Sequence, residues 1–134
     1  MTDIDSLQAA LGRIFAPWVQ QLGLRVRAVR GGDVVLALPV TPELMHVGGI
    51  LCGQATMAAA DSAMVLAIGL DLGEFRPMTT VQLQTSFLKP IAGAEAHVTA
   101  RVLRRGKSLV FGEIEIAGAD GKLAAHATTT YALL

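Results

Sequence analysis

The chain has 134 residues, of which 52% are hydrophobic, 16% are charged and 4% are aromatic. This length predicts a single domain over residues 1–134, and this composition excludes a disordered chain. Eleven basic residues balance eleven acidic ones, which excludes a generally basic nucleic-acid binder.

The first part of the chain predicts a helix followed by a hairpin. Over residues 6–19, apolar residues recur with helical spacing, with Ser6 or Asp5 as the expected cap and a break or a second short turn at Pro17. Two alternating runs, residues 24–29 and 34–40, flank the pair Gly31 and Gly32. Such a pair tolerates the positive φ of a tight turn, so we expect a β-hairpin.

The middle of the chain is a long apolar segment, residues 50–72. It has the length of a membrane span, but an Asp near its centre would cost roughly 2.5–3.5 kcal/mol in a bilayer. We therefore predict a buried helix over residues 53–70 of a protein without a membrane partner. The N-terminus lacks the features of a signal peptide, so we expect a cytoplasmic protein.

Four strand-like runs follow, at residues 79–88, 94–103, 109–116 and 123–133. They alternate between apolar and polar residues and are joined by short turns, which favours antiparallel neighbours. The predicted architecture is α+β, with an antiparallel six-stranded sheet wrapped around the long central helix. The high apolar content further indicates that part of the surface is buried against another subunit.

Asp61 is the most unusual residue, because it is a carboxylate within a helix that must be largely buried. It is expected to be a general base or a nucleophile that faces a cleft. The structural alternative is a carboxylate that bonds backbone amides or pairs with an arginine of a partner subunit.

A glycine-rich segment, residues 48–54, leads into the same helix. The first N–H groups of a helix lack internal partners, and they can stabilise a carbonyl oxygen that becomes negative during acyl transfer. The alternative is a plain turn that starts a helix. Gln54 lies seven residues before Asp61, so the two share nearly one helix face.

These features resemble the PaaI-like acyl-CoA thioesterases of the hotdog fold. That family's pattern is Asn-x-x-Gly-x-x-His-Gly-Gly, followed by Asp or Glu seven positions after the last glycine. Gly49, Gly53 and Asp61 match this pattern. Three positions depart from it: His46 replaces the Asn, Cys52 the His and Gln54 the second Gly.

The resemblance implies hydrolysis of an acyl-CoA thioester to a free acid and CoA. Asp61 would be the base or nucleophile, the N–H groups at Gly53 and Gln54 would form the oxyanion hole, and His46 would supply a donor. In related enzymes the carboxylate and the oxyanion donors come from different subunits, which implies a homodimer or a homotetramer. No cofactor is expected, because CoA is part of the substrate, and the widely spread histidines suggest no metal site.

The resemblance also assigns roles to residues that follow the helix. Thr80 would help to orient the attacking water, although it is also simply a good strand former. The basic turn Arg104, Arg105, Lys107 and Ser108 would bind the phosphates of CoA. The alternative for this turn is a solvated loop.

The sequence also fits other functions. One alternative is a nucleophilic Cys52 near the helix N-terminus, with His46 as its base. An acyl-thioester hydratase or dehydratase would share the fold, and a non-catalytic acyl-CoA binding domain would tolerate the three departures from the pattern. The residues expected to line the acyl pocket are Trp18, Met57, Met64, Val65 and Phe87.

Overall fold

The computed structural model describes residues 1–134. Helices α1 (Ile4–Leu11) and α2 (Pro17–Gln20) precede the hairpin of strands β1 (Arg25–Arg30) and β2 (Asp33–Pro39). The 3-10 helix η1 (Pro42–Leu44) leads to the central helix α3 (Gly53–Leu72). The remaining strands are β3 (Met78–Phe87), β4 (Glu95–Arg105), β5 (Leu109–Ala117) and β6 (Leu123–Leu133).

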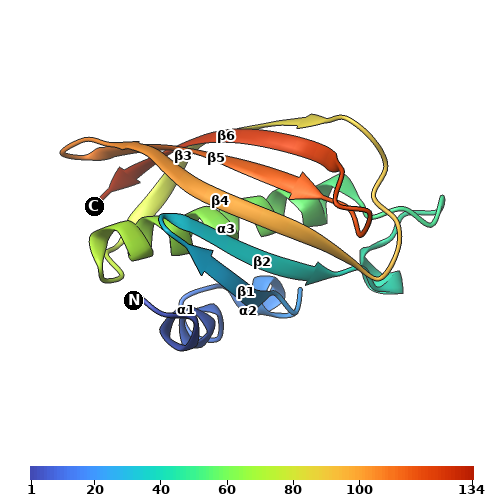
Figure 1. Cartoon of the computed structure of the whole chain (residues 1–134), viewed down its shortest axis with the longest axis horizontal. Coiled ribbons are helices and arrows are strands. Elements are labelled where there is room, and N and C mark those ends of the chain that lie inside the picture. Colours follow the sequence, from blue (N-terminus) through green and yellow to red (C-terminus); the bar gives the residue numbers. More distant parts are fainter.

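The six strands form one sheet with the order β1-β2-β4-β5-β6-β3, and every pairing is antiparallel. The sheet curls around α3, while α1 and α2 lie beside the β1 edge (Figure 1). The predicted fold class is therefore confirmed. Strand β3 forms the other edge of the sheet, and most of its residues are exposed.

Helix α3 is the core of the domain, as its sequence predicts. It is long and apolar enough to cross a membrane, but 61% of its most apolar stretch is buried inside the domain. The helix ends at Leu72, two residues beyond the predicted end, and Gly73, with a φ of 80°, provides a left-handed C-cap. Its side chains pack mainly against β4 and β5.

The break predicted at Pro17 is confirmed, but the first helix ends earlier than predicted and has a different cap. It ends at Leu11, and a separate short helix begins at Pro17, which suits the first turn of a helix because it has no N–H to place. The cap of α1 is Asp3, whose side chain accepts a hydrogen bond from the Ser6 N–H at 2.8 Å. Ser6 instead completes a capping box.

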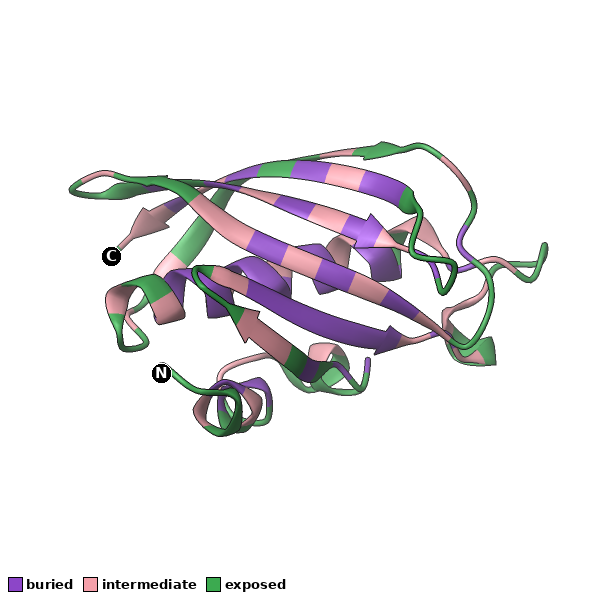
Figure 2. Ribbon diagram, viewed as in Figure 1, coloured by how far each residue is buried: buried purple, intermediate pink, exposed green.

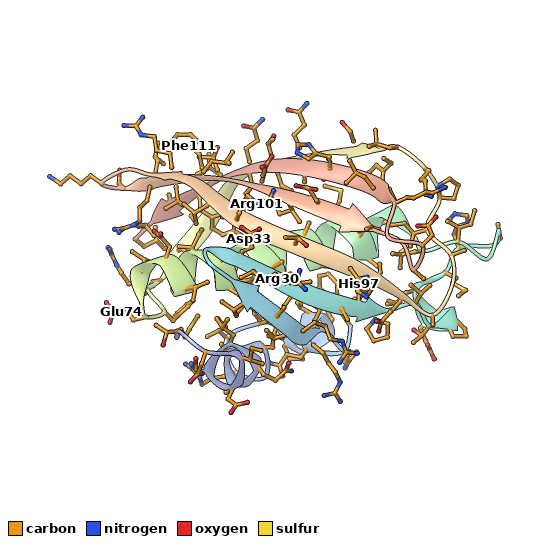
Figure 3. All side chains as sticks on the ribbon, in the orientation of Figure 1. Arg30, Asp33, Glu74, His97, Arg101 and Phe111 are labelled. Atoms are coloured by element: carbon orange, nitrogen blue, oxygen red, sulfur yellow. The ribbon has the colours of Figure 1, made fainter.

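The outer face of the sheet is polar and carries no helix. Along β4, buried residues that face α3 alternate with partly exposed ones (Figure 2). Arg101 at the centre of this face contacts Asp33 on β2 at 3.2 Å, and Glu113 at 3.0 Å and Glu115 at 2.5 Å on β5. Figure 3 labels Arg101 and Asp33, which lie on the neighbouring strands β4 and β2. His126 on β6 extends the network to Glu113 at 3.1 Å.

Arg101→Met is expected to lower the free energy of unfolding at pH 7 by about 1–3 kcal/mol, because three carboxylates would lose their shared cation. The hydrogen bonds from His126 and Arg101 hold the pKa of Glu113 below its ordinary value of 4.5. This stabilisation is therefore present above pH 4.5 and is lost as the pH falls further. Urea unfolding should show that the difference in the free energy of unfolding between wild type and variant becomes smaller below pH 4.5.

Arg27→Met is the matched control, because the Arg27–Glu95 pair at 3.4 Å is half-exposed. Such a surface pair is worth only about 0–1 kcal/mol. Equal losses in the two variants would contradict a special role for the Arg101 network.

Candidate active site

The carboxylate of Asp61 lies midway along α3 and is held by two hydroxyl groups from the sheet. The Thr80 hydroxyl on β3 donates to Asp61 Oδ1 at 2.9 Å and to Oδ2 at 3.2 Å. The Tyr131 hydroxyl on β6 donates to Oδ1 and also lies 3.0 Å from the Asp61 carbonyl oxygen. Asp61 makes no ion pair within the chain.

A bulge in β3 turns Thr80 toward the helix. Gln82 pairs with Thr130 and Thr80 pairs with Tyr131, so Val81 between them has no partner on β6. Strict alternation from the partly buried Leu83 would place Val81 beside Tyr131 and would turn Thr80 outward. The extra residue reverses this order, and it thereby brings the Thr80 hydroxyl to Asp61.

Tyr131 is a site residue that the sequence analysis missed. Its side chain is buried, with 2% exposed. Burial raises the pKa of the Tyr131 phenol above its ordinary value, and the negative charge of Asp61 raises it further. The phenol therefore remains a protonated donor. The available signal was the single tyrosine of the chain, at an inward position of an alternating strand.

A cavity of about 390 Å³ opens beside Asp61, between α3, the α1–α2 segment and β3. Its walls are mainly apolar and include Phe15, Trp18 and Leu83. Gln54 also lines it, so the prediction that Gln54 and Asp61 share one helix face is confirmed. A second cavity of about 260 Å³ lies against Asp61, Thr80 and Tyr131.

The guessed pocket residues divide among different places. Trp18 and Met57 line the cavity of about 390 Å³ beside Asp61, and Val65 lines the second cavity, of about 260 Å³. Phe87 borders a third cavity at the start of α3. Met64 is wrong as a pocket residue, because it is fully buried in the core.

The start of α3 leaves two backbone N–H groups free. The Cys52 Sγ caps the helix by accepting from the Ala55 N–H at 3.4 Å, and the Thr56 N–H bonds the Cys52 carbonyl at 3.2 Å. The N–H groups of Gly53 and Gln54 have no acceptor. These are the two donors that the sequence proposes for an oxyanion hole.

Gly53 also has a structural reason to be glycine. A Cβ placed there would lie 3.3 Å from Cζ of Phe87, which is tighter than ordinary packing allows. The missing side chain therefore lets the Phe87 ring lie against the helix start, as well as leaving room for a ligand near the backbone.

His46 lies near the start of α3 rather than near Asp61. It lines the third cavity, of about 420 Å³, together with Gly53, Phe87 and Lys89. Its Nδ1 accepts from the Gly48 N–H at 3.0 Å, which leaves Nε2 as the protonated donor of the neutral ring. Asp61 is absent from this cavity.

The alternative of a Cys52–His46 pair finds no geometric support. Cys52 lines a different cavity, with Trp18 and Glu43, and its sulfur already serves as the cap of α3. No hydrogen bond joins the two side chains.

The carboxylate and the free N–H groups are too far apart to act together within one chain. Position 61 is eight residues beyond position 53, which corresponds to about 12 Å along an α-helix. One carbonyl group needs both partners within about 3 Å of its reacting atoms. A site that uses both features therefore needs the helix start of a second copy.

The basic turn between β4 and β5 lies near the C-terminal end of α3. Arg105 Nε contacts Asp71 Oδ2 of that helix at 2.6 Å, and Arg104 and Lys107 are exposed and make no ion pair. Asp71 is 18 residues beyond Gly53, or about 27 Å along the helix. Within one chain, the turn is therefore remote from the predicted oxyanion donors.

The sheet and the helix together define the hotdog fold, and solved structures share it over most or all of the chain. A thioesterase from Haemophilus influenzae matches with a TM-score of 0.89 at 20% identity, covering 100% of this chain and 92% of that one. A mutant of the phenylacetic acid degradation protein PaaI from Thermus thermophilus matches with a TM-score of 0.77 at 24% identity, covering 89% and 100%.

The sequence comparison agrees with the structural comparison. The profile of the thioesterase superfamily matches residues 48–125, so the chain belongs to that superfamily. A relative from Saccharolobus solfataricus, whose name proposes an esterase, is 32% identical over 113 residues, or 84% of this chain and 80% of its own. These relationships support thioester hydrolysis as the general activity.

Proposed function

We propose that this protein hydrolyses acyl-CoA thioesters, with Asp61 as the catalytic carboxylate of a site shared between two copies of the chain. The observation that carries this proposal is the pair of complementary half-sites. One is a carboxylate held by Thr80 and Tyr131 beside an apolar cavity. The other is a helix start with two free N–H groups.

In the general-base route, Asp61 takes a proton from water while the water oxygen attacks the thioester carbonyl carbon. The carbonyl oxygen becomes negative and is stabilised by the N–H groups of Gly53 and Gln54 from the second copy. The tetrahedral intermediate then expels the CoA thiolate, which takes the proton from Asp61. His46 lines the same cavity as Gly53, so its Nε2 would supply a further donor to the thioester.

In the nucleophilic route, Asp61 attacks the carbonyl carbon itself and releases the CoA thiolate. The resulting mixed anhydride is hydrolysed by a water molecule, which restores the carboxylate. Both routes use the same oxyanion donors and leave the same products. Neither route requires a metal or a redox cofactor, and Thr80 positions the carboxylate in both.

The two ends of the substrate have separate candidate sites. The apolar walls around Trp18 suit an acyl group, because burial of its apolar surface favours binding. Arg104, Arg105, Lys107 and Ser108 would face the phosphates of CoA. Because Arg105 is already paired with Asp71, Arg104 and Lys107 are the cations free to do so.

The test is a panel of short-chain, medium-chain and aromatic acyl-CoA esters, with released CoA detected by a thiol-reactive dye. The single thiol of Cys52 is subtracted as a constant background. We expect CoA release from at least one class of ester. Binding of the esters without release from any of them would instead identify a non-catalytic acyl-CoA binding protein.

The double variant Arg104→Ala/Lys107→Ala is expected to raise KM for acyl-CoA about tenfold, with kcat nearly unchanged. Two cations that bind phosphate contribute equally to the ground state and the transition state. Acyl-pantetheine esters, which lack the nucleotide phosphates, should show no such change.

Arg30→Ala provides the control for the loss of surface charge, because Arg30 is exposed at the β1–β2 turn and makes no ion pair. It should leave both KM values unaltered. An equal rise in KM for the CoA and pantetheine esters in the double variant would show that the basic turn does not recognise the nucleotide.

A further inference from the structure

Tyr131 joins three parts of the fold at the catalytic carboxylate. It lies on β6, pairs with Thr80 of β3 across the sheet, and reaches Asp61 on α3, which is 70 residues away in the sequence. Its phenol is buried and is the only tyrosine hydroxyl in the chain. A buried hydroxyl needs a hydrogen-bond partner, and here that partner is the group proposed to react.

The two carboxylate oxygens of Asp61 accept different hydrogen bonds. Oδ1 accepts from Tyr131 and, at 2.9 Å, from Thr80. Oδ2 has only the longer Thr80 contact at 3.2 Å. The Thr80 hydroxyl has a single proton and favours the nearer oxygen. Oδ2 is therefore the oxygen with free lone pairs, available to take a proton or to attack a carbonyl carbon.

We infer that Tyr131 is a positioning residue, which anchors Asp61 through Oδ1 and so presents Oδ2 to the thioester. This inference rests on the proposed function. A carboxylate on a helix otherwise rotates about its side-chain bonds, and a misplaced reacting group loses much of the advantage of proximity. Thr80 alone leaves one rotation open, whereas two donors on different strands fix the carboxylate plane.

Tyr131→Phe tests this inference through separate measurement of kcat and KM. We expect kcat to fall about tenfold with little change in KM, because the reacting oxygen is misplaced whereas the substrate still binds. Wild-type values of both constants would overturn the inference.

Thr129→Val is the matched control for a merely structural effect. Thr129 lies on the same strand, is buried, and donates to the Gln82 carbonyl at 2.7 Å rather than to Asp61. Its loss should reduce stability without lowering kcat. An equal fall in kcat in both variants would assign the effect of Tyr131 to the packing of the sheet.

A spectroscopic measurement keeps the inference separate from the proposed activity. The ratio of the paired tyrosine Raman bands near neutral pH reports how strongly a phenol donates, and one tyrosine makes the signal unambiguous. We expect a strong donor in the wild type and a weaker one in Asp61→Asn. A spectrum that is the same in both would overturn the inference even if the protein hydrolyses thioesters. Failure of all esters to react, with this difference present, would instead reject the proposed function.

Discussion

Asp61→Asn is expected to reduce kcat for acyl-CoA hydrolysis by about 10²–10⁴-fold, because the amide neither takes a proton from water nor attacks a carbonyl. The variant keeps the size of the side chain and can still accept hydrogen bonds from Thr80 and Tyr131. Binding of acyl-CoA, measured by calorimetry, should therefore remain close to that of the wild type.

Asp5→Asn is a suitable control, since it removes an exposed carboxylate from α1 that makes no ion pair. It should have wild-type kcat and KM. Retention of wild-type kcat in Asp61→Asn would show that this carboxylate does not react. It would support the structural alternative, in which Asp61 is a buried acid that only stabilises the fold.

Gln54→Pro is expected to lower kcat by about 10²–10³-fold, because it removes one of the two proposed oxyanion donors. Gln54 is the second residue of α3, and its N–H has no acceptor within the chain. Proline is tolerated in the first helical turn for that reason. Gln54→Ala, which loses the side chain but keeps the N–H, is the control and should retain most of the activity.

Co-expression of Gln54→Pro with Asp61→Asn tests whether the site is shared between copies. In a mixed dimer, one chain supplies an intact carboxylate and the other supplies an intact helix start. Random assortment then restores about a quarter of the wild-type activity through one intact site in half of the dimers. No recovery above the level of the two separate variants would place the whole site within one chain.

The main elements of the fold could be predicted because their signals are local. Alternation in residues 94–103 and 109–116 identified the strands that became β4 and β5, and an all-round apolar run identified α3. The first helix was less predictable, because periodic apolar residues continue to Ile14 although the helix ends at Leu11. Periodicity reports which side chains are apolar, whereas the end of a helix depends on backbone hydrogen bonds.

The candidate site was predictable only in part. Asp61 was identified because a charge in an apolar helix is unusual, and Gln54 because helical spacing is regular. Tyr131 was missed because its role depends on the register between β3 and β6 and on contact across 70 residues. The same register explains why the Thr80 side chain points toward α3. Simple alternation along β3 would turn it outward, but the unpaired residue Val81 reverses the order.

The bulge at Val81 affects how this chain should be aligned with its relatives. Val81 is a surplus residue, since Thr80 and Gln82 pair with consecutive residues of β6. A strand one residue shorter would run straight and would still present the Thr80 position to the helix. An alignment that forbids a gap here would match Thr80 with the wrong column, and it would hide a shared active-site hydroxyl.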